Sequence, residues 1–358
     1  MQDKNAGYSI IKGIADNAEL ENYRQVFEKN GTERDIANLQ WLHQQNMAHT
    51  NTIYYAMQNE EVAAIYTALP VMFKIDNVLL PALQSIDTMT DIDHRGKGLF
   101  PKLATKLYSD AAENNFALVY GFPNENSAPG FFKKLQWTSF GEAPFLLKPI
   151  NPFYFIKKFI NRNKKQEDFS SFTHIYHAPE TKQINNSVVI KALANFDQAY
   201  DQIWQTVSKN IKVCVNRNAE YMNWRYVNKP AEHYYRYGIF TDGQLKAVVV
   251  YAIKGKHGGR IGYIMDLIFA PENRSAGKQL LKFTSQQFRQ QKTDTVLTWS
   301  LPGSFNYTCF KNSGYFSLPL KLRPQHLFLG VRPFNDTYSG LILDSKNWYI
   351  SYSDSDTV

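Results

Sequence analysis

The order of apolar and polar positions along the first part of the chain predicts a mixture of helices and strands. Two runs rich in apolar residues, Ile53–Gln58 and Val62–Leu69, flank Asn59-Glu60 and predict a β-hairpin. The segment Leu20–Gln45, which precedes them, is predicted to be a helical region. Alternation of apolar and polar residues over Ser85–Asp91 predicts a further strand. The first part of the chain is therefore expected to form an α/β domain.

The predicted strand leads through a glycine-rich turn into a helix. The helix is indicated by apolar positions that recur at helical spacing from Leu99 onward. Between strand and helix stands Arg95-Gly-Lys-Gly98, where two glycines let the backbone approach an anion without a Cβ in the way. The unpaired N–H groups from Gly96 to Phe100 and the positive end of the helix dipole attract negative charge. The segment therefore predicts a phosphate-binding turn, and an ordinary strand-to-helix loop is the alternative interpretation.

This turn differs from the two common nucleotide-binding loops. No Gly-x-x-x-x-Gly-Lys-Ser/Thr is present, and the Rossmann motif would need a third glycine where Pro101 stands. Instead, Arg95-Gly-Lys-Gly-Leu-Phe100 resembles the Arg/Gln-x-x-Gly-x-Gly/Ala motif of the GNAT superfamily of acyl-CoA-dependent N-acyltransferases, with Phe100 departing from its sixth position. The segments Phe116–Phe122, Pro123–Ser127 and Phe131–Trp137 follow in the order of that superfamily's fifth strand, Asn-x-x-Ser/Ala turn and last short helix.

The chain also contains a long internal repeat. Asp87 and the Arg-x-x-Gly that follows it recur in the second half from Asp266 onward, and Trp41 recurs as Trp224 at nearly the same offset. A repeat of this length indicates a duplicated domain, and 358 residues suffice for two cores. The resemblance then implies an α/β fold of two tandem GNAT-like domains, each with a mixed, mostly antiparallel sheet whose central strands splay apart between helices. We expect the domains at 1–150 and 185–358, with a connector at 151–184.

The second half of the chain shows its own strand and helix signals. A strand is predicted at Val188–Lys191, a helix at Phe196–Val207 and a hairpin at Asp242-Gly243, where Asp-Gly is a strong turn signal. The run Val296–Ser300 is the expected counterpart of the fifth strand. The tail Ser351–Val358 is polar and is expected to fray.

Composition narrows the class of protein. An apolar fraction of 44% with prolines spread through the chain indicates a globular protein. Two cysteines give no disulfide framework, and scattered histidines give no metal pattern, so we expect a cytoplasmic protein without a metal. No apolar run reaches the ~18 residues of a membrane span, which predicts a soluble protein. Six of the basic residues lie in 148–165, so the net charge of +8 is local and argues against nucleic acid as a partner.

The basic segment itself has two interpretations. It combines two prolines with a short pattern of apolar and basic residues, which favours a linker helix that packs its Phe and Ile side chains on the first domain and exposes its lysines to solvent. The second interpretation is a weak contact of 153–165 with a membrane surface, where aromatic side chains enter the interface and lysines meet anionic lipid.

The resemblance implies roles for named residues. In GNAT proteins the backbone of the fourth strand pairs with pantetheine and the following turn holds the pyrophosphate of acetyl-CoA or another acyl-CoA. Carried onto this sequence, the cofactor-binding set is Met89, Thr90, Asp91, Arg95, Gly96, Lys97, Gly98, Leu99, Phe100, Asn124 and Phe132. Asp87 is the candidate catalytic base, because a carboxylate early in that strand can take the proton of an amine. A structural aspartate is the equal alternative, since Asp266 repeats it.

Two features limit the catalytic interpretation. The tyrosine that GNAT enzymes commonly use as proton donor is replaced by Phe132, which has no proton to give, so the thiolate leaves unaided or a polar residue of the Pro123–Ser127 turn assists. In the second half, Arg274–Gln279 has one glycine fewer and ends in a bulky glutamine, so we expect acyl-CoA in the first half only. The aromatic group at Asn223–Tyr226 and Tyr234–Tyr237 is expected either to line an acceptor pocket or to pack in the core.

Three hypotheses follow. The first is a tandem-GNAT N-acyltransferase that moves an acyl group, in the first instance acetyl, to a small-molecule primary amine. The sequence is similar to proteins associated with surface-polysaccharide synthesis, which suggests an amino sugar as that amine. The second is a Fem-like peptidyltransferase, which draws aminoacyl groups from transfer RNA. The third is a non-catalytic acyl-CoA-binding protein. The oligomeric state and the acyl chain length stay open.

Overall fold

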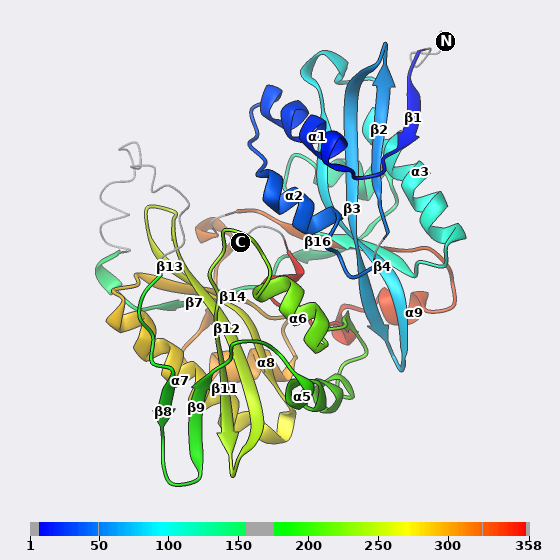
Figure 1. Ribbon diagram of the computed structural model, residues 1–358. Coiled ribbons are helices and arrows are strands. Elements are labelled where there is room, and N and C mark those ends of the chain that lie inside the picture. Colours follow the sequence, from blue (N-terminus) through cyan, green and yellow to red (C-terminus); the bar gives the residue numbers. More distant parts are fainter. Residues whose placement is uncertain (1–6, 49, 155–174, 324, 356–358) are drawn as a thin grey trace. The chain divides into compact units, whose positions relative to one another are not determined.

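The computed structural model describes residues 7–48, 50–154, 175–323 and 325–355 (Figure 1). The chain folds into two compact units, each assembled from separate stretches of sequence. The first unit comprises Met1–Glu142, Asn228–Pro230 and Leu327–Ser345, and the second comprises Ala143–Val227, Ala231–His326 and Lys346–Val358.

The first unit is a mixed sheet between two layers of helices. Its sheet contains strands in the order β1-β2-β3-β4-β5-β16-β6. The strands are β1 (Ser9–Lys12), β2 (Ile53–Gln58), β3 (Glu61–Ile75), β4 (Val78–Thr90), β5 (Leu118–Gly121), β6 (Thr138–Glu142) and β16 (Phe328–Pro333). The helices are α1 (Asn17–Lys29), α2 (Ile36–His43), η1 (Ile92–His94), α3 (Leu99–Glu113), η2 (Gly130–Lys134) and α9 (Ser339–Ile342).

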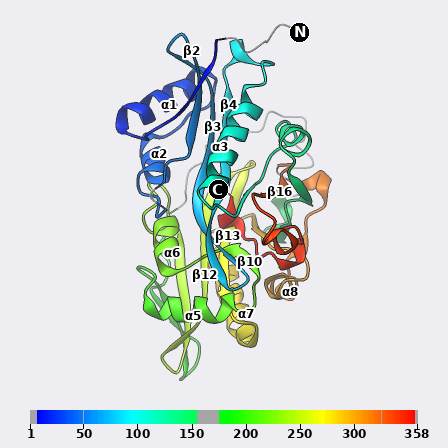
Figure 2. The same cartoon turned by 90° about the vertical axis from the view of Figure 1, so that its right-hand side faces the viewer.

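The alternation of side chains along the strands creates a core on each face of this sheet. Tyr54 and Tyr66 pack in the cluster under α3, whereas their neighbours Tyr55 and Ile65 pack in the cluster under α1 and α2. Figure 2 shows α1 and α2 on one side of β3 and β4, and α3 on the other. The hairpin predicted at Asn59-Glu60 is confirmed, and both residues have positive φ, 50° and 68°.

The second unit repeats this plan. Its eight-stranded sheet, within the described residues, has the order β15-β7-β14-β13-β12-β11-β9-β8. The strands are β7 (Phe145–Pro149), β8 (Thr181–Gln183), β9 (Val188–Ala192), β11 (Tyr235–Thr241), β12 (Gln244–Lys256), β13 (Gly259–Phe269), β14 (Thr295–Trp299) and β15 (Phe316–Ser317), with β10 (Val213–Val215) outside it. The helices are α5 (Gln198–Ser208), α6 (Ala219–Tyr226), η3 (Pro271–Asn273), α7 (Arg274–Gln290), α8 (Phe305–Lys311), η4 (Leu320–Leu322) and η6 (Tyr352–Asp354).

Each unit completes its sheet with a strand from the other half of the sequence. β7 follows β6 directly along the chain, but it pairs with β14 and β15 in the second unit. β16, near the carboxyl end, pairs with β5 and β6 in the first unit. The compact units therefore differ from the expected domains 1–150 and 185–358 by an exchange of strands. The expected connector also differs, because β8 inside it pairs with β9 at the sheet edge.

Both units contain the splayed pair of central strands that the resemblance implies. β4 runs parallel to β5 only over Leu83–Ser85, and then continues alone on that side to Thr90. β13 likewise pairs with β14 only over Ile261–Tyr263 and continues to Phe269. In each unit the register with the preceding strand shifts just after this point, which is a β-bulge. The predicted duplication is therefore visible in the details of the backbone.

Candidate functional site

The strand, turn and helix predicted around the Arg-Gly-Lys-Gly motif are present. β4 ends at Thr90, and α3 begins at Leu99. Gly96 and Gly98 have φ of 77° and 73°, a conformation that favours glycine, and a Cβ on either would point into open space. Gly98 is the N-cap of α3 and has no side chain to cover the first amides of the helix. The turn therefore leaves room for an anion at the start of α3.

Phe100 explains how the departure from the sixth motif position is accommodated. Its ring lies at Gly130, where an added Cβ would come within 2.7 Å of the Phe100 Cε1 atom. The ring also packs against Phe131 with centroids 5.0 Å apart. The absence of a side chain at Gly130 therefore leaves the space that the Phe100 ring occupies. Leu99, the neighbouring member of the expected set, is buried in the core under α3.

Tyr8, which the sequence analysis did not single out, contacts two side chains of the turn, His94 and Lys97. Tyr8 hydrogen-bonds through its hydroxyl to Nδ1 of His94, with 2.8 Å between the atoms. Lys97 places its Nζ atom 5.7 Å from the centroid of the Tyr8 ring. Arg95 is exposed, and its Nε donates to the carbonyl of Thr90 at 3.4 Å. Two cationic side chains, Arg95 and Lys97, thus flank the glycines.

The three residues expected along pantetheine have different surroundings. Met89 points into the core under α1, and Thr90 pairs with Ala64 of β3. The side chain of Asp91 is buried and accepts from Asn30 Nδ2 at 3.3 Å and from Lys29 at 3.2 Å. Burial raises the pKa of Asp91, but bonds from the Asp93 amide, Lys29 and Asn30 outweigh it and lower the pKa below its usual value. Asp91 therefore anchors the turn to α1 through its side chain.

Asp87 lies in the splayed part of β4, on the face covered by α1 and α2. Arg34 Nη2 donates to Oδ1 at 2.6 Å and Arg34 Nε donates to Oδ2 at 3.1 Å. Tyr23 of α1 donates its hydroxyl to Oδ2 at 2.7 Å. The bulge in β4 decides this orientation, because it turns Asp87 to the opposite face from Ser85. Both carboxylate oxygens are thus engaged by neighbouring side chains.

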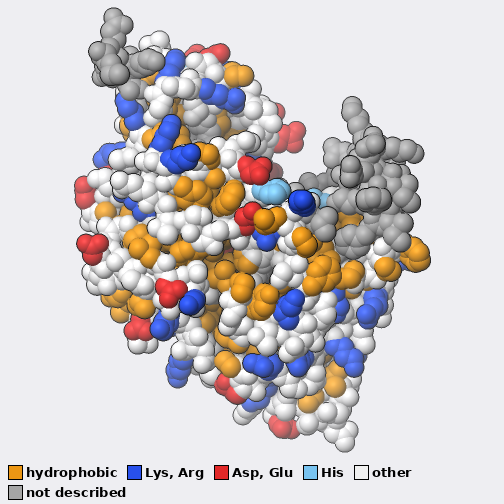
Figure 3. Space-filling view, turned by 180° about the vertical axis from the view of Figure 1, so that it is seen from behind, with side chains coloured by type: hydrophobic (Ala, Val, Ile, Leu, Met, Phe, Trp, Pro, Cys, Tyr) orange, Lys and Arg blue, Asp and Glu red, His pale blue; other side chains and the backbone are white. Residues whose placement is uncertain are grey.

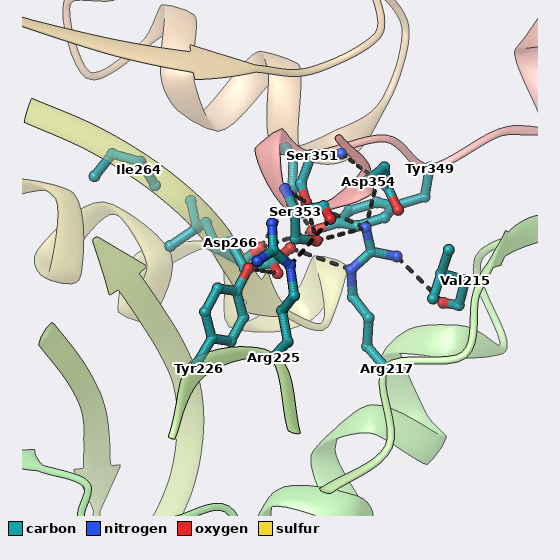
Figure 4. A network of polar contacts seen from close by, with 12 residues as sticks. Val215, Arg217, Arg225, Tyr226, Ile264, Asp266, Tyr349, Ser351, Ser353 and Asp354 are labelled. Carbon is teal, nitrogen blue, oxygen red and sulfur yellow. Dashed lines mark hydrogen bonds and ion pairs between the residues drawn. The ribbon is translucent and has the colours of Figure 1, made fainter. Parts of the chain in front are cut away.

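Asp266 in the second unit has the same kind of partners (Figure 4). Arg217 Nε donates to Oδ1 at 3.2 Å, and Tyr226 donates its hydroxyl to Oδ2 at 2.5 Å. Arg34 and Arg217 are related by the same offset as Trp41 and Trp224. That shared offset was the sequence signal that could have found both arginines. An aspartate paired with arginine and tyrosine in both units supports the structural interpretation of Asp87.

The carboxyl-terminal segment occupies the splay of the second unit. Residues 348–355 are all buried, so the expectation that the tail frays from Ser351 is wrong as far as Ser355. Tyr352 stacks on Trp299 of β14, with centroids 4.6 Å apart, and meets the edge of Tyr263 of β13. Tyr349 donates its hydroxyl to the carbonyl of Leu267, in the part of β13 that has left β14. The tail thus fills the position between β13 and β14.

The buried arginine network of Figure 4 fastens this tail. Arg217 Nη2 donates to Asp354 Oδ2 at 2.5 Å and to the hydroxyls of Ser351 and Ser353. Arg225 donates to the carbonyl of Ser355 at 3.0 Å. Burial alone would lower the pKa of Arg217, but Asp354 and Asp266 outweigh it and raise the pKa. Arg217 therefore stays charged and holds the tail by an ion pair with Asp354, and Arg225 adds hydrogen bonds to backbone carbonyls.

The second unit also lacks the glycine turn at the start of its helix. α7 begins at Arg274, so Gly277 lies inside the helix and has no positive φ. A Cβ there would come within 2.9 Å of the Phe269 ring, which indicates that this glycine serves the packing of helix on strand. Gln279 is likewise a helix residue. The anion-binding geometry of the first unit is therefore absent from the described part of the second.

The two remaining members of the expected cofactor set have structural contacts. Asn124 is exposed, and its Oδ1 accepts from the amides of Asn126 and Ser127 at 3.0 Å and 3.1 Å, which closes a turn. Phe132 lies against Gly330 of β16 and meets the edge of Phe328. Ser85 is the last residue of β4 that pairs with β5, and its hydroxyl accepts from Tyr66 at 3.1 Å. Sequence reasoning missed this hydroxyl.

The aromatic residues proposed as an acceptor pocket are packed in the core of the second unit. Tyr235 and Tyr251 stack with centroids 5.0 Å apart. Tyr235 and Tyr237 donate their hydroxyls to the carbonyls of Tyr176 and Pro179. Their rings are thus stacked and their hydroxyls hydrogen-bonded within the unit, which favours packing in the core over an acceptor pocket.

The basic segment expected as a linker or membrane contact, 153–165, lies mostly outside the described residues, which end at Tyr154 and resume at Ile175. Phe153 is exposed, whereas Tyr154 is buried. On the face shown in Figure 3, lysine and arginine side chains are dispersed among acidic and apolar ones. Among the helices that the structure describes, none has the length and apolar character to cross a membrane.

Comparison with known proteins agrees with the resemblance. Residues 17–140 match the family model of an acetyltransferase (GNAT) domain. This match covers most of the first unit, including the splayed end of β4 and the glycine turn. No curated protein matches the sequence.

Solved structures extend the likeness to the whole chain. A GCN5-related N-acetyltransferase from Anabaena variabilis is 12% identical with a TM-score of 0.62, over 92% of this chain and 73% of that one. A conserved protein of unknown function from Enterococcus faecalis, described as a probable N-acyltransferase, is 13% identical with a TM-score of 0.62, over 91% and 72%. Saccharomyces cerevisiae N-myristoyltransferase with bound myristoyl-CoA is 10% identical with a TM-score of 0.59, over 91% and 79%. The chain thus has the tandem two-domain fold of GNAT acyltransferases.

Proposed function

We propose that the protein is an N-acyltransferase that moves an acyl group, in the first instance acetyl, from acyl-CoA to a primary amine. The observation that carries the proposal is the turn at the start of α3, where Gly96 and Gly98 adopt positive φ beside the unpaired end of β4. A GNAT family match over the same residues supports acyl-CoA as the ligand. For the acceptor we propose an amino sugar.

In this proposal the cofactor lies along the splay of the first unit. The amides from Gly96 to Phe100 hold the pyrophosphate, with Arg95 and Lys97 adding positive charge. Pantetheine pairs with the free edge of β4 between Ser85 and Asp91, through backbone groups. This is compatible with the expected set Met89, Thr90 and Asp91, because the side chains of Met89 and Asp91 are engaged elsewhere.

The second unit binds no acyl-CoA in this proposal. Its helix begins without a glycine turn, and Tyr352 stands between Trp299 and Tyr263 where the cofactor would otherwise enter. The full chain should therefore bind one acetyl-CoA, and the site should be in the first unit.

Calorimetry with acetyl-CoA tests the binding step. Wild type should bind with a stoichiometry of one, and Gly98→Glu should abolish binding because it places a carboxylate at the pyrophosphate position. The matched control is Gly303→Glu, since Gly303 also has positive φ, 89°, with open space around it, just before the N-cap of α8. The control imposes the same backbone strain and charge and should bind normally. Equal binding by Gly98→Glu and wild type would contradict the proposed site.

Release of free thiol from acetyl-CoA separates an enzyme from a binding protein. The panel of acceptors contains glucosamine, galactosamine, ethanolamine and spermidine, and each is assayed with longer acyl-CoA donors as well. Binding without thiol release for any amine supports the non-catalytic hypothesis, which the missing tyrosine at Phe132 motivates. Absence of all CoA binding supports the Fem-like hypothesis instead, and aminoacyl-transfer RNA then becomes the donor to test.

A further inference from the structure

His43, at the end of α2, has a ring nitrogen without a hydrogen-bond partner. Its Nε2 atom is shielded from solvent, and among the described residues nothing donates to it or accepts from it. The ring lies beside Tyr23, with centroids 6.1 Å apart, next to the cluster around Asp87. Burial lowers the pKa of His43 to about 4, against a smaller opposing effect of Asp87. The imidazole is therefore neutral near pH 7, and one of its nitrogens has a free lone pair.

In the second unit the residue equivalent to His43 has a hydrogen-bond partner. The offset that relates Arg34 to Arg217 also relates His43 to Tyr226. Tyr226 donates its hydroxyl to Asp266 and thereby satisfies its polar group within the unit. In the first unit Tyr23 of α1 fills that place on Asp87, and His43 is left with an unpaired nitrogen. A buried polar atom without a partner destabilises a protein. At this pair of equivalent positions the first unit has such an atom, whereas the hydroxyl of Tyr226 in the second is hydrogen-bonded.

We infer that Nε2 of His43 receives the acceptor amine and takes its proton. The inference rests on the proposed function. The unit in which the imidazole nitrogen has no partner is also the unit with the complete glycine turn. In the other unit the equivalent tyrosine is hydrogen-bonded to Asp266, the helix begins without a glycine turn, and Tyr352 lies between the splayed strands. Asp87, next to His43, lies in the part of β4 that has left β5, on the face of α1 and α2.

The step balances with the groups present. The lone pair of the neutral amine forms a bond to the thioester carbon, and the bond from that carbon to sulfur breaks with its electron pair on sulfur. The proton of the attacking nitrogen moves to Nε2, and the imidazolium gives it to the thiolate, so that an amide and free CoA thiol result. This route needs no tyrosine at the position of Phe132.

The groups that face the imidazole fit this role. Asp87 of β4 stabilises the imidazolium by its charge, and Arg34 and Tyr23 keep that carboxylate in place. Asp87 is a positioning residue in this scheme, because its own oxygens are already bound. Asp87 was expected to be the base, and in this scheme its negative charge instead stabilises the protonated imidazole of His43.

The test compares His43→Gln and His43→Ala with His233→Gln. His233 is the matched control, since it is a histidine of the second unit whose pKa is also lowered by burial. The measurements are acetyl-CoA affinity by calorimetry, kcat and KM for the most active amine of the panel, and rescue by added imidazole. We expect His43→Gln to lower kcat/KM about 100-fold or more with unchanged acetyl-CoA affinity. Imidazole should restore part of the activity of His43→Ala, and His233→Gln should behave as wild type.

Three results would overturn the inference. The first is activity of His43→Gln within about threefold of wild type. The second is a parallel loss of acetyl-CoA affinity and activity in both variants, which indicates a structural role. The third is an inactive His43→Ala that binds acetyl-CoA but gains nothing from imidazole. Failure of the proposed function is distinct, because then wild type itself releases no thiol.

Discussion

Replacing Arg217 by methionine should strongly destabilise the second unit. The side chain of Arg217 is fully buried and donates to two carboxylates, two hydroxyls and the carbonyl of Val215. Methionine fills a similar volume but leaves the buried carboxylates of Asp266 and Asp354 without the arginine that pairs with both. Breaking a buried ion pair on one side costs about 3 to 5 kcal/mol, since a charge is left uncompensated. We expect a loss of that size in the free energy of unfolding.

The measurements are thermal unfolding and hydrogen exchange. For a unit of about 200 residues, 1 kcal/mol corresponds to about 2 to 4 °C, so the Tm should fall by about 6 to 20 °C. Amides of Trp348–Ser355 should exchange faster, because Arg217 fastens this tail. The control is Arg24→Met, since Arg24 pairs with Glu21 and Glu28 on the surface of α1. Such pairs contribute about 1 kcal/mol or less, so the control should barely change the Tm.

The pH dependence of Arg217→Met checks the electrostatic reasoning. Burial raises the pKa of Asp354 and Arg217 opposes this, so removal of Arg217 should raise the pKa further. A carboxyl whose folded-state pKa lies above its unfolded value of about 3.9 binds the proton more tightly when folded. Stability then falls as the pH rises through that interval, so lowering the pH from 7 to 5 should restore part of the loss. A loss below about 1 kcal/mol at pH 7, or no recovery at pH 5, would refute the argument.

Two further predictions concern the first unit. Gly130→Ala should destabilise it by about 1 to 3 kcal/mol in urea unfolding, because the new Cβ would come within 2.7 Å of the Phe100 ring. Adding Phe100→Leu to the same chain should recover part of this loss. Equal stability of Gly130→Ala and wild type would contradict that packing. His43 has a folded-state pKa of about 4 against about 6.5 when unfolded, so stability should fall as the pH drops from 6.5 toward 4. Urea unfolding at pH 7 and pH 4.5 should show a smaller pH effect in His43→Gln than in wild type, and an equal effect would exclude His43 as the source.

Local sequence patterns predicted the elements that depend on neighbouring residues. The strand, turn and helix around Arg95–Gly98 formed as predicted, since glycine conformation and helical spacing are properties of a short segment. The hairpins at Asn59-Glu60 and Asp242-Gly243 formed for the same reason. The helical region expected at Leu20–Gln45 is divided into α1 and α2, whose N-caps are Asp16 and Asp35. The aspartate at 35, a helix-start signal, was available in the sequence.

The polar partners of the candidate site could not be predicted from short segments. Arg34 and Asp87 are 53 residues apart in sequence and meet only because the bulge in β4 turns Asp87 toward α2. A shift of register by one residue moves a side chain to the other face of a sheet, and alternation alone does not reveal such a shift. The offset between Trp41 and Trp224 nevertheless held the signal for Arg34, Arg217 and His43.

The sequence by itself determined that the chain is a duplicated α/β protein with a glycine turn suited to a phosphate in its first half. It did so because glycine conformation, side-chain periodicity and an internal repeat are properties of the chain itself. Only the tertiary structure decided that β7 pairs in the second unit and β16 in the first, and that the carboxyl-terminal tail fills the gap between β13 and β14. Those outcomes depend on which distant strand edge and which buried charge a segment meets, and such contacts form only when the chain has folded.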